Sequence, residues 1–317
     1  MRDDPAPMTA TASGLDETMW LLGQPQLSDY LDFVHDRVVG GAGHCPRALA
    51  DEWRAANDLY YDLENEEAGI ADEIDCRPLP DMLAPLAAEL MASPQFRRTF
   101  DTLPVTIEMV ELEKLMVSQT YVTATFSERR AATLDRRPDP ETLFRYCQPL
   151  TSDRPDVRIE RSDDETYIFS SACTDLRPHR VQLLTADKLS NLESTGPITA
   201  AIALIVGFGS NYLTAIRSDH RLVLHNGYHR AHSLIAAGIR HAPCLVQTVT
   251  RKDELRIAAS EEVSADPAFF FRSARPPLMK DFFNPRLAKR YLTRPSRTVV
   301  EIDYKLTRTV RVEAERG

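Results

Sequence analysis

The sequence lacks the cysteine pattern of a disulfide-bonded or zinc-binding protein. Its five cysteines are scattered over 317 residues, and none belongs to a Cys-x-x-Cys pair. A disulfide framework and a zinc site are therefore not expected. Cys244 lies between Pro243 and Leu245 in an apolar stretch, which predicts a buried thiol.

Long hydrophobic runs, internal repeats and low-complexity tracts are missing as well. The longest apolar run, residues 198–208, is shorter than the roughly 18 residues that a membrane-spanning helix needs. The opening residues Met-Arg-Asp-Asp-Pro are charged and contain no apolar segment, unlike a secretory signal. We therefore expect a cytoplasmic protein with no membrane partner.

Positive charge is scarce in the first hundred residues. They hold 7 Lys/Arg and 19 Asp/Glu, a net charge of −12, whereas residues 251–317 hold 15 and 10, a net charge of +5. The acidic part would repel double-stranded DNA, so only the C-terminal part could offset that repulsion. Solvated acidic and basic faces are the simpler interpretation of the same distribution.

The remaining composition, 43% hydrophobic and 27% charged, favours a soluble α+β protein of two or three units. We expect a flexible N-terminus (1–25), an acidic helical cap (26–103), a central mixed α/β domain (104–250) and a basic, strand-containing extension (251–317). Apolar periodicity predicts helices over residues 27–39, 48–74, 81–92, 128–134, 139–147 and 198–206. Alternation predicts strands over residues 105–112, 157–159, 166–169, 212–217, 221–224, 299–304 and 307–312, and around Pro243.

Residues 222–246 are the most informative part of the chain. An apolar strand ends at Asn226-Gly227, a helix begins with His229-Arg230 and ends at Gly238, and a second apolar strand follows. Gly227 permits a positive φ and a close approach of backbone to ligand. The first amides of the helix lack carbonyl partners, Arg230 can bind phosphate through two N–H groups, and His229 can add a donor. This pattern predicts a phosphate-binding turn, although Asn-Gly is also a common tight-turn pair.

The run Gly227-Tyr228-His229-Arg230 resembles the phosphate-binding signature of the ParB/sulfiredoxin superfamily. Residues 107–119 are similar to the opening strand and turn of that family, and the likeness covers about residues 104–250. The resemblance implies a mixed α/β domain that binds the phosphates of ATP or CTP together with Mg²⁺. Asn226 and the four signature residues would then form the phosphate site.

The signature departs from the family at several positions. Tyr228 stands where sulfiredoxins have a reactive cysteine, and a phenol with a pKa near ~10 does not act as a thiolate. His229 and His232 stand where partition proteins of the ParB type carry arginines. Asn226 and Gln119 stand near the places of two acids in members that phosphorylate small molecules. Sulfinic acid reduction is therefore not expected, and CTP switching of the ParB type loses support.

A substitute catalytic acid would have to come from elsewhere. Glu111 and Glu113, two apart on the predicted strand, would share one face and could hold Mg²⁺ together with substrate phosphates. Asp175 is the third candidate. A solvated strand edge is the simpler interpretation of the glutamate pair.

Other polar segments offer supporting residues. The loop at residues 174–180 contains Arg177 and Arg180, which could clamp further phosphates or a carboxylate. Ser210-Asn211 could line a pocket, although a helix cap and turn is the simpler interpretation. The five histidines between residues 220 and 241 lack the His-x-x-x-His pattern with an adjoining Glu, so no metal site is predicted.

Residues 280–297 combine lysines and arginines with aromatic side chains. This composition permits binding of single-stranded nucleic acid by stacking and charge. Aromatic side chains in a core, with arginines on a solvated surface, are the commoner arrangement.

The leading hypothesis is a nucleotide-dependent enzyme that transfers or hydrolyses a phosphoryl group on a small-molecule or protein substrate. The alternative is a non-catalytic, nucleotide-gated module of the partition type, or one that binds a protein partner. The sequence selects neither the nucleotide, the acceptor nor the oligomeric state.

Overall fold

The computed structural model describes residues 14–24, 26–135, 137–150, 155–162, 165–189 and 195–310. The chain has the predicted α+β class. It divides into two compact units, one formed by residues 1–152 with 210–295 and the other by residues 153–209 with 296–317. These bounds differ from those expected at residues 103 and 250, because the helices of residues 26–103 share hydrophobic clusters with later elements.

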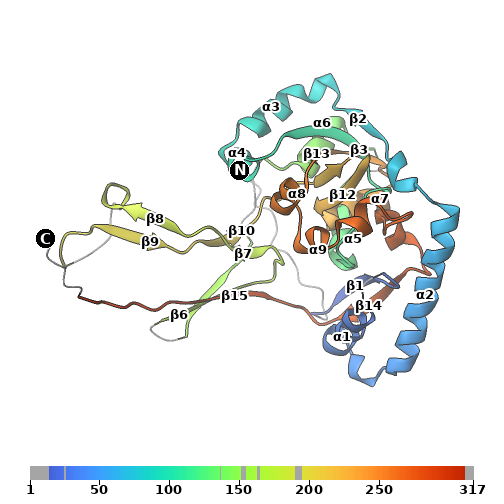
Figure 1. Cartoon of the computed structure of the whole chain (residues 1–317), viewed down its shortest axis with the longest axis horizontal. Helices are drawn as coiled ribbons and strands as arrows, with labels where there is room; N and C mark the ends of the chain where they lie inside the picture. Colours follow the sequence, from blue (N-terminus) through green and yellow to red (C-terminus); the bar gives the residue numbers. More distant parts are fainter. Residues whose placement is uncertain are drawn as a thin grey trace, which may run out of the picture. The chain divides into compact units, whose positions relative to one another are not determined.

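The first unit contains a five-stranded mixed sheet (Figure 1). In spatial order its strands are β12 (Arg221–Asn226), β11 (Thr214–Ser218), β13 (His241–Val249), β3 (Val105–Glu111) and β2 (Cys76–Pro78). β11 and β13 are parallel, and the other neighbours are antiparallel. Two neighbouring parallel strands cannot be joined by a tight turn. The chain therefore runs from β11 to β13 through β12 and α7 (Tyr228–Ala236).

A second sheet of this unit has the order β14-β1-β4. Its strands are β14 (Ala288–Thr293), β1 (Asp16–Leu21) and β4 (Tyr121–Thr123), and both pairings are antiparallel. The prediction of a flexible segment at residues 1–25 is wrong for β1, because Met19, Trp20 and Leu21 are buried between later parts of the chain. Residues 1–13 lie outside the described residues.

The predicted helices of the first half are confirmed with altered ends. They are α1 (Leu27–Arg37), α2 (Pro46–Glu66), α3 (Ala84–Ala92), α5 (Ala124–Ala132) and α6 (Pro140–Cys147). A further short helix, α4 (Pro94–Thr99), follows α3. α2 ends before residue 74 because Gly69 adopts a positive φ and residues 70–73 form a 3₁₀ turn. Three short helices follow β13, namely α8 (Lys252–Ala258), α9 (Glu261–Ala265) and α10 (Pro267–Phe271).

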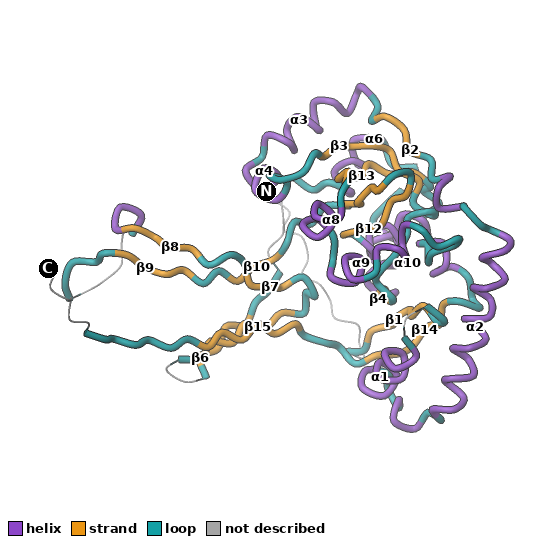
Figure 2. The backbone as a smooth tube through the Cα atoms, viewed as in Figure 1, coloured by secondary structure: helices purple, strands orange, loops and turns teal. Residues whose placement is uncertain are grey.

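The second unit consists mainly of antiparallel ribbons (Figure 2). Its strands are β5 (Arg158–Arg161), β6 (Thr166–Ser171), β7 (Leu176–Pro178), β8 (Gln182–Thr185), β9 (Ala200–Ala203), β10 (Val206–Phe208) and β15 (Thr298–Asp303). The predicted helix over residues 198–206 is wrong, because this segment pairs with β8 and β7 as strands. The strand predicted over residues 307–312 is wrong for residues 307–310, which have no regular structure. Residues 311 and 312 lie outside the described residues.

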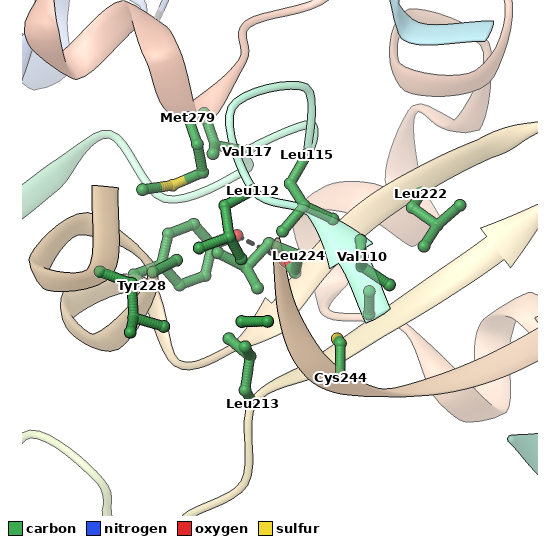
Figure 3. Packing of buried hydrophobic residues seen from close by; sticks show 14 of the residues in the cluster. Val110, Leu112, Leu115, Val117, Leu213, Leu222, Leu224, Tyr228, Cys244 and Met279 are labelled. Carbon is green, nitrogen blue, oxygen red and sulfur yellow. Dashed lines mark hydrogen bonds between the residues drawn. The ribbon is translucent and has the colours of Figure 1, made fainter. Parts of the chain in front are cut away.

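One hydrophobic cluster fixes the segment between β12 and α7 (Figure 3). Leu224 at the end of β12 and Leu213 before β11 are buried in it together with Tyr228 at the start of α7. Cys244 of β13 is also fully buried, which confirms the predicted buried thiol. Burial of each leucine stabilises the fold by about 1.5–3 kcal/mol, so both sides of the turn are held rigidly.

Candidate functional site

The turn between β12 and α7 has the backbone geometry that the sequence predicts. Gly227 has a φ of 96° at the N-terminus of the helix, and a Cβ there would lie 2.9 Å from the Leu213 side chain. Asn226 holds the turn from within, because its Nδ2 donates to the Ser210 carbonyl at 2.7 Å and its Oδ1 accepts from the Gly227 amide at 2.7 Å. The Gly227 amide is therefore already capped.

The three amides after it remain available as donors. Within the described residues, the backbone N–H groups of Tyr228, His229 and Arg230 have no acceptor, and the first amide of this turn to bond back is that of Ala231, at 2.8 Å from the Gly227 carbonyl. Such unpaired amides give a helix N-terminus its attraction for anions.

The Tyr228 side chain does not face a ligand. Its hydroxyl donates to the Leu224 carbonyl at 2.7 Å and accepts from the amides of Ser118 at 3.1 Å and Gln119 at 3.4 Å. Figure 3 shows the ring directed into the hydrophobic cluster beside Leu112. Burial raises the pKa of this phenol. Tyr228 therefore ties the segment after β3 to α7, and only its backbone amide remains for the predicted phosphate contact.

Of the two histidines of α7, His232 is buried and His229 is half-buried, and both are neutral. His229 Nε2 accepts from the Thr123 amide at 2.9 Å, so in the neutral ring the proton, and with it the donor that the sequence predicts, is on Nδ1. The ring of His232 stacks on Phe283 at 4.6 Å, and neither of its nitrogens has a hydrogen-bond partner. Burial lowers the pKa of each histidine to about 4. Neither side chain adds positive charge at neutral pH.

Arg230 lies beneath the surface of the same turn. It is 3% exposed, and its Nη2 donates to Asn211 Oδ1 at 2.9 Å. Its Nε and Nη1 have no acceptor, and its guanidinium carbon lies 5.9 Å from the centre of the Tyr146 ring. A buried donor without an acceptor normally lowers stability by about 1–3 kcal/mol. Binding of a hydrogen-bond acceptor to Nε and Nη1 would therefore be favourable.

A second arginine contacts the same tyrosine. The Arg130 guanidinium carbon lies 4.8 Å from the Tyr146 ring centre, and Arg130 Nε lies 3.3 Å from the Tyr146 hydroxyl. That hydroxyl shares a 2.6 Å hydrogen bond with Ser233 Oγ, and Ser233 in turn donates to the Arg230 carbonyl at 2.8 Å. Arg130, Tyr146, Arg230 and Asn211 are named the arginine pair site below.

The arginine pair site has an excess of positive charge. Neither arginine forms an ion pair with a carboxylate in the part of the chain that the structure describes. Burial, together with the charge of Arg130, lowers the pKa of Arg230 to about 10. Cys147 lies close enough for both arginines to favour its thiolate, but burial raises the pKa of this thiol to about 12. The site therefore carries cations with no protein anion.

The predicted catalytic glutamates lie at the other end of α7. β3 ends at Glu111, so Glu113 is not on the strand as expected. Glu111 accepts from the Asp75 amide at 3.0 Å and pairs with Lys114 at 3.3 Å. Arg240, which follows the helix, lies 4.0 Å from Glu111 and 3.9 Å from Glu113. A helix of nine residues is about 13 Å long, and it separates these acids from Arg230.

The remaining predicted residues lie in other segments, and most have local partners. Asp175 and Arg177 form an ion pair in the second unit, where Arg180 is exposed. The Gln119 side chain donates to the Tyr121 carbonyl. Cations of residues 280–297 are largely engaged in the first unit, as ion pairs or hydrogen bonds, namely Lys280 with Glu67, Lys289 with Glu52, Arg290 with Glu17 and Glu128, and Arg294 with the Asp36 carbonyl.

The sequence identifies Arg230 and offers Asn211 as a pocket residue, but it gives no signal for Arg130 or Tyr146. Arg130, Tyr146 and Asn211 come from three separate segments, and no fixed spacing links them to the signature. Asn211 is exposed at the edge of the site, where the sequence favours a cap and turn. The cluster becomes visible only when α5, α6 and α7 pack together.

No protein-family model, curated protein or solved structure matches this chain. Among the described residues, no group of three or more His, Cys, Asp or Glu is arranged to hold a metal ion. No helix in the described ranges is long and apolar enough to cross a membrane.

Proposed function

We propose that this chain is a nucleotide-gated binding module on a ParB/sulfiredoxin-like domain, with ATP or CTP as the first candidate ligands. The observation that carries the proposal is the buried Arg230 guanidinium, which has two donor nitrogens without acceptors and no carboxylate partner among the described residues. An isolated buried charge is unfavourable. A phosphate oxyanion would satisfy the donors and offset the charge.

Ligand entry requires a small local rearrangement. The Nε and Nη1 atoms, which have no acceptor, are buried, whereas Asn211, which bonds to Nη2, is exposed. A phosphate group that displaces the Asn211 side chain would reach Arg230 first. Arg130 and the unpaired amides of residues 228–230 then supply further donors. Binding would move the Asn211 side chain and the Tyr146 ring, and this movement is the conformational change that gates the module.

The position of the acids favours binding over phosphoryl transfer. Glu111 and Glu113 are engaged by cations at the far end of α7. Arg230 itself bonds to the Asn211 amide, lies beside the Tyr146 ring and acts electrostatically on the Cys147 thiol. Mg²⁺ prefers carboxylate and water oxygens, so these side chains do not fit a protein-held Mg²⁺. Any Mg²⁺ would arrive on the nucleotide.

Thermal unfolding of the full chain in inorganic phosphate, ATP or CTP tests the proposal. A ligand at one hundred times its Kd stabilises the folded state by about 2.7 kcal/mol. We expect such stabilisation in the natural chain and its loss in Arg230→Met. Without ligand, Arg230→Met should unfold at the same temperature or higher, because it removes an uncompensated buried charge.

Arg240→Gln is the matched control, since this arginine is exposed at the opposite end of α7. It should keep the full response to phosphate. Stabilisation that persists in Arg230→Met, or none with any of the three ligands, would contradict the proposal. Phosphate release from ATP or CTP at many turnovers would instead favour the enzyme hypothesis.

A further inference from the structure

A cavity beside α2 has the lining of a cation-binding site. It has a volume of about 360 Å³ and lies between α2, the residues Gly23, Gln24 and Gln26, and Phe269 of α10. Small-molecule sites begin at about 300 Å³, so a metabolite of modest size fits. The whole lining belongs to the first unit.

Aromatic side chains form much of the wall. Trp53, Tyr60 and Tyr61 come from one face of α2, where residues seven and eight apart lie on the same side of the helix, and Phe269 faces them. Tyr61 is 61% exposed, so part of this aromatic surface meets solvent. The face of an aromatic ring attracts cations, most strongly for tryptophan.

One carboxylate in the wall has no counter-charge. Glu64 is half-buried, and it has no hydrogen-bond or ion-pair partner within the described ranges. Behind the cavity, Tyr60 donates to Asp281 at 3.3 Å. Asp281 belongs to a network with Arg275, Glu67 and Lys280 that holds two cations and two carboxylates. Since that network is neutral, Glu64 leaves the cavity with a net negative charge.

The cavity wall is held in place before any ligand binds. Asn57 of α2 donates to the Gly23 carbonyl at 2.7 Å. Gly23 has a φ of 80°, and a Cβ there would lie 2.5 Å from the Asn57 backbone nitrogen. Only glycine allows the loop to approach the helix so closely. A preformed site loses less free energy on binding than one that must order first.

We propose that this cavity binds a small organic cation, an alkylammonium or a guanidinium compound, between its aromatic wall and Glu64. The inference is independent of the phosphate site, because no residue is shared between the two. The charge of α2 supports it: this helix carries six acids and two arginines, and such a surface raises the local concentration of cations.

Isothermal titration of the full chain with choline and with agmatine tests the site. We expect binding of at least one of these cations, and weaker binding of the neutral choline isostere 3,3-dimethylbutanol. Glu64→Gln and Tyr61→Ala should each weaken the binding by about tenfold, which corresponds to about 1.4 kcal/mol. Both positions lie at the protein surface, so the variants should fold.

Glu66→Gln is the control, because it removes the same charge from α2 at a position outside the cavity lining. It should bind like the natural chain. If neither cation binds at millimolar concentration, or if Glu64→Gln and Glu66→Gln weaken binding equally, the cavity is not the site. Phosphate-dependent stabilisation is expected to be unchanged in Glu64→Gln, so failure here would leave the phosphate proposal standing.

Discussion

Two buried arginines of the first unit have opposite environments. The Arg275 side chain is 1% exposed and pairs with Asp281 and Glu67, and its Nη1 also donates to the Pro276 carbonyl at 3.1 Å. Arg230 is buried to a similar degree but bonds only to the neutral Asn211 amide. The same residue type is therefore structural at one position and a candidate for ligand binding at the other.

Removal of Arg275 should be strongly destabilising. Arg275→Met would leave the carboxylate of Asp281, which is 2% exposed, without its cation. We expect the free energy of unfolding to fall by about 3–5 kcal/mol, measured by urea denaturation. Arg54→Met is the control, because Arg54 and Asp51 form an exposed pair that should contribute less than about 1 kcal/mol. Equal losses in the two variants would refute this assignment.

At the scale of elements, α7 owes its position to the glycines at its two ends. Gly227 and Gly238 both have positive φ, but a Cβ at Gly227 would contact Leu213, whereas nothing lies within 4 Å of one at Gly238. A side chain at position 227 would therefore meet both backbone strain and a clash, whereas a side chain at position 238 would meet backbone strain alone. Comparison of the two positions separates these effects on one helix.

Gly227→Ala should therefore cost more than Gly238→Ala. Backbone strain at a positive φ costs about 1–3 kcal/mol, so we expect both variants to be destabilised. The clash with the fixed Leu213 should make Gly227→Ala the worse by about 1 kcal/mol or more. Chemical denaturation of the two variants measures the difference. A smaller loss for Gly227→Ala would mean that the turn can relax away from Leu213.

The elements show how far the sequence determines this fold. Apolar periodicity locates α1, α2 and α6 well, because their buried faces repeat with the helical period. It fails at residues 198–206, where alanine and isoleucine suit either structure and pairing with β8 and β7 decides for strands. Alternation also misses β1, whose partners lie far away in the sequence.

The candidate site is predicted only in part for the same reason. Gly227 and Arg230 are local features of one turn, so the sequence reveals them. Arg130 and Tyr146 reach the site from α5 and α6, and tertiary packing alone brings them to Arg230. The neutral state of His229 follows from burial, which the sequence pattern at a helix start does not disclose.

At the scale of the whole molecule, the first unit is interrupted by the second. The chain leaves it near Cys147 and returns near Leu213, and these residues are joined, since the Leu213 amide donates to the Cys147 carbonyl at 2.9 Å. Gln148 Nε2 also donates to the Leu213 carbonyl at 2.9 Å. A short linker could therefore replace residues 153–209 without moving either point.

A chain in which a Gly-Ser linker replaces residues 153–209, and which ends at residue 295, should fold by itself. We expect cooperative unfolding by calorimetry within about 5 °C of the first transition of the full chain, and an undiminished response to phosphate. The arginine pair site lies wholly in the retained part. A broad, non-cooperative transition would show that the excised residues are required for folding.

The antiparallel pairing of β1 with β14 has a consequence for biosynthesis. Thr18 and Thr293, whose hydroxyls lie 2.9 Å apart, are separated by 275 residues. At synthesis rates of about 5–20 residues per second, β14 follows β1 by roughly 15–60 seconds. During that interval one edge of an apolar strand is open on the ribosome. Translation arrest before residue 288 would leave an unpaired strand edge, which is a template for aggregation until a chaperone covers it.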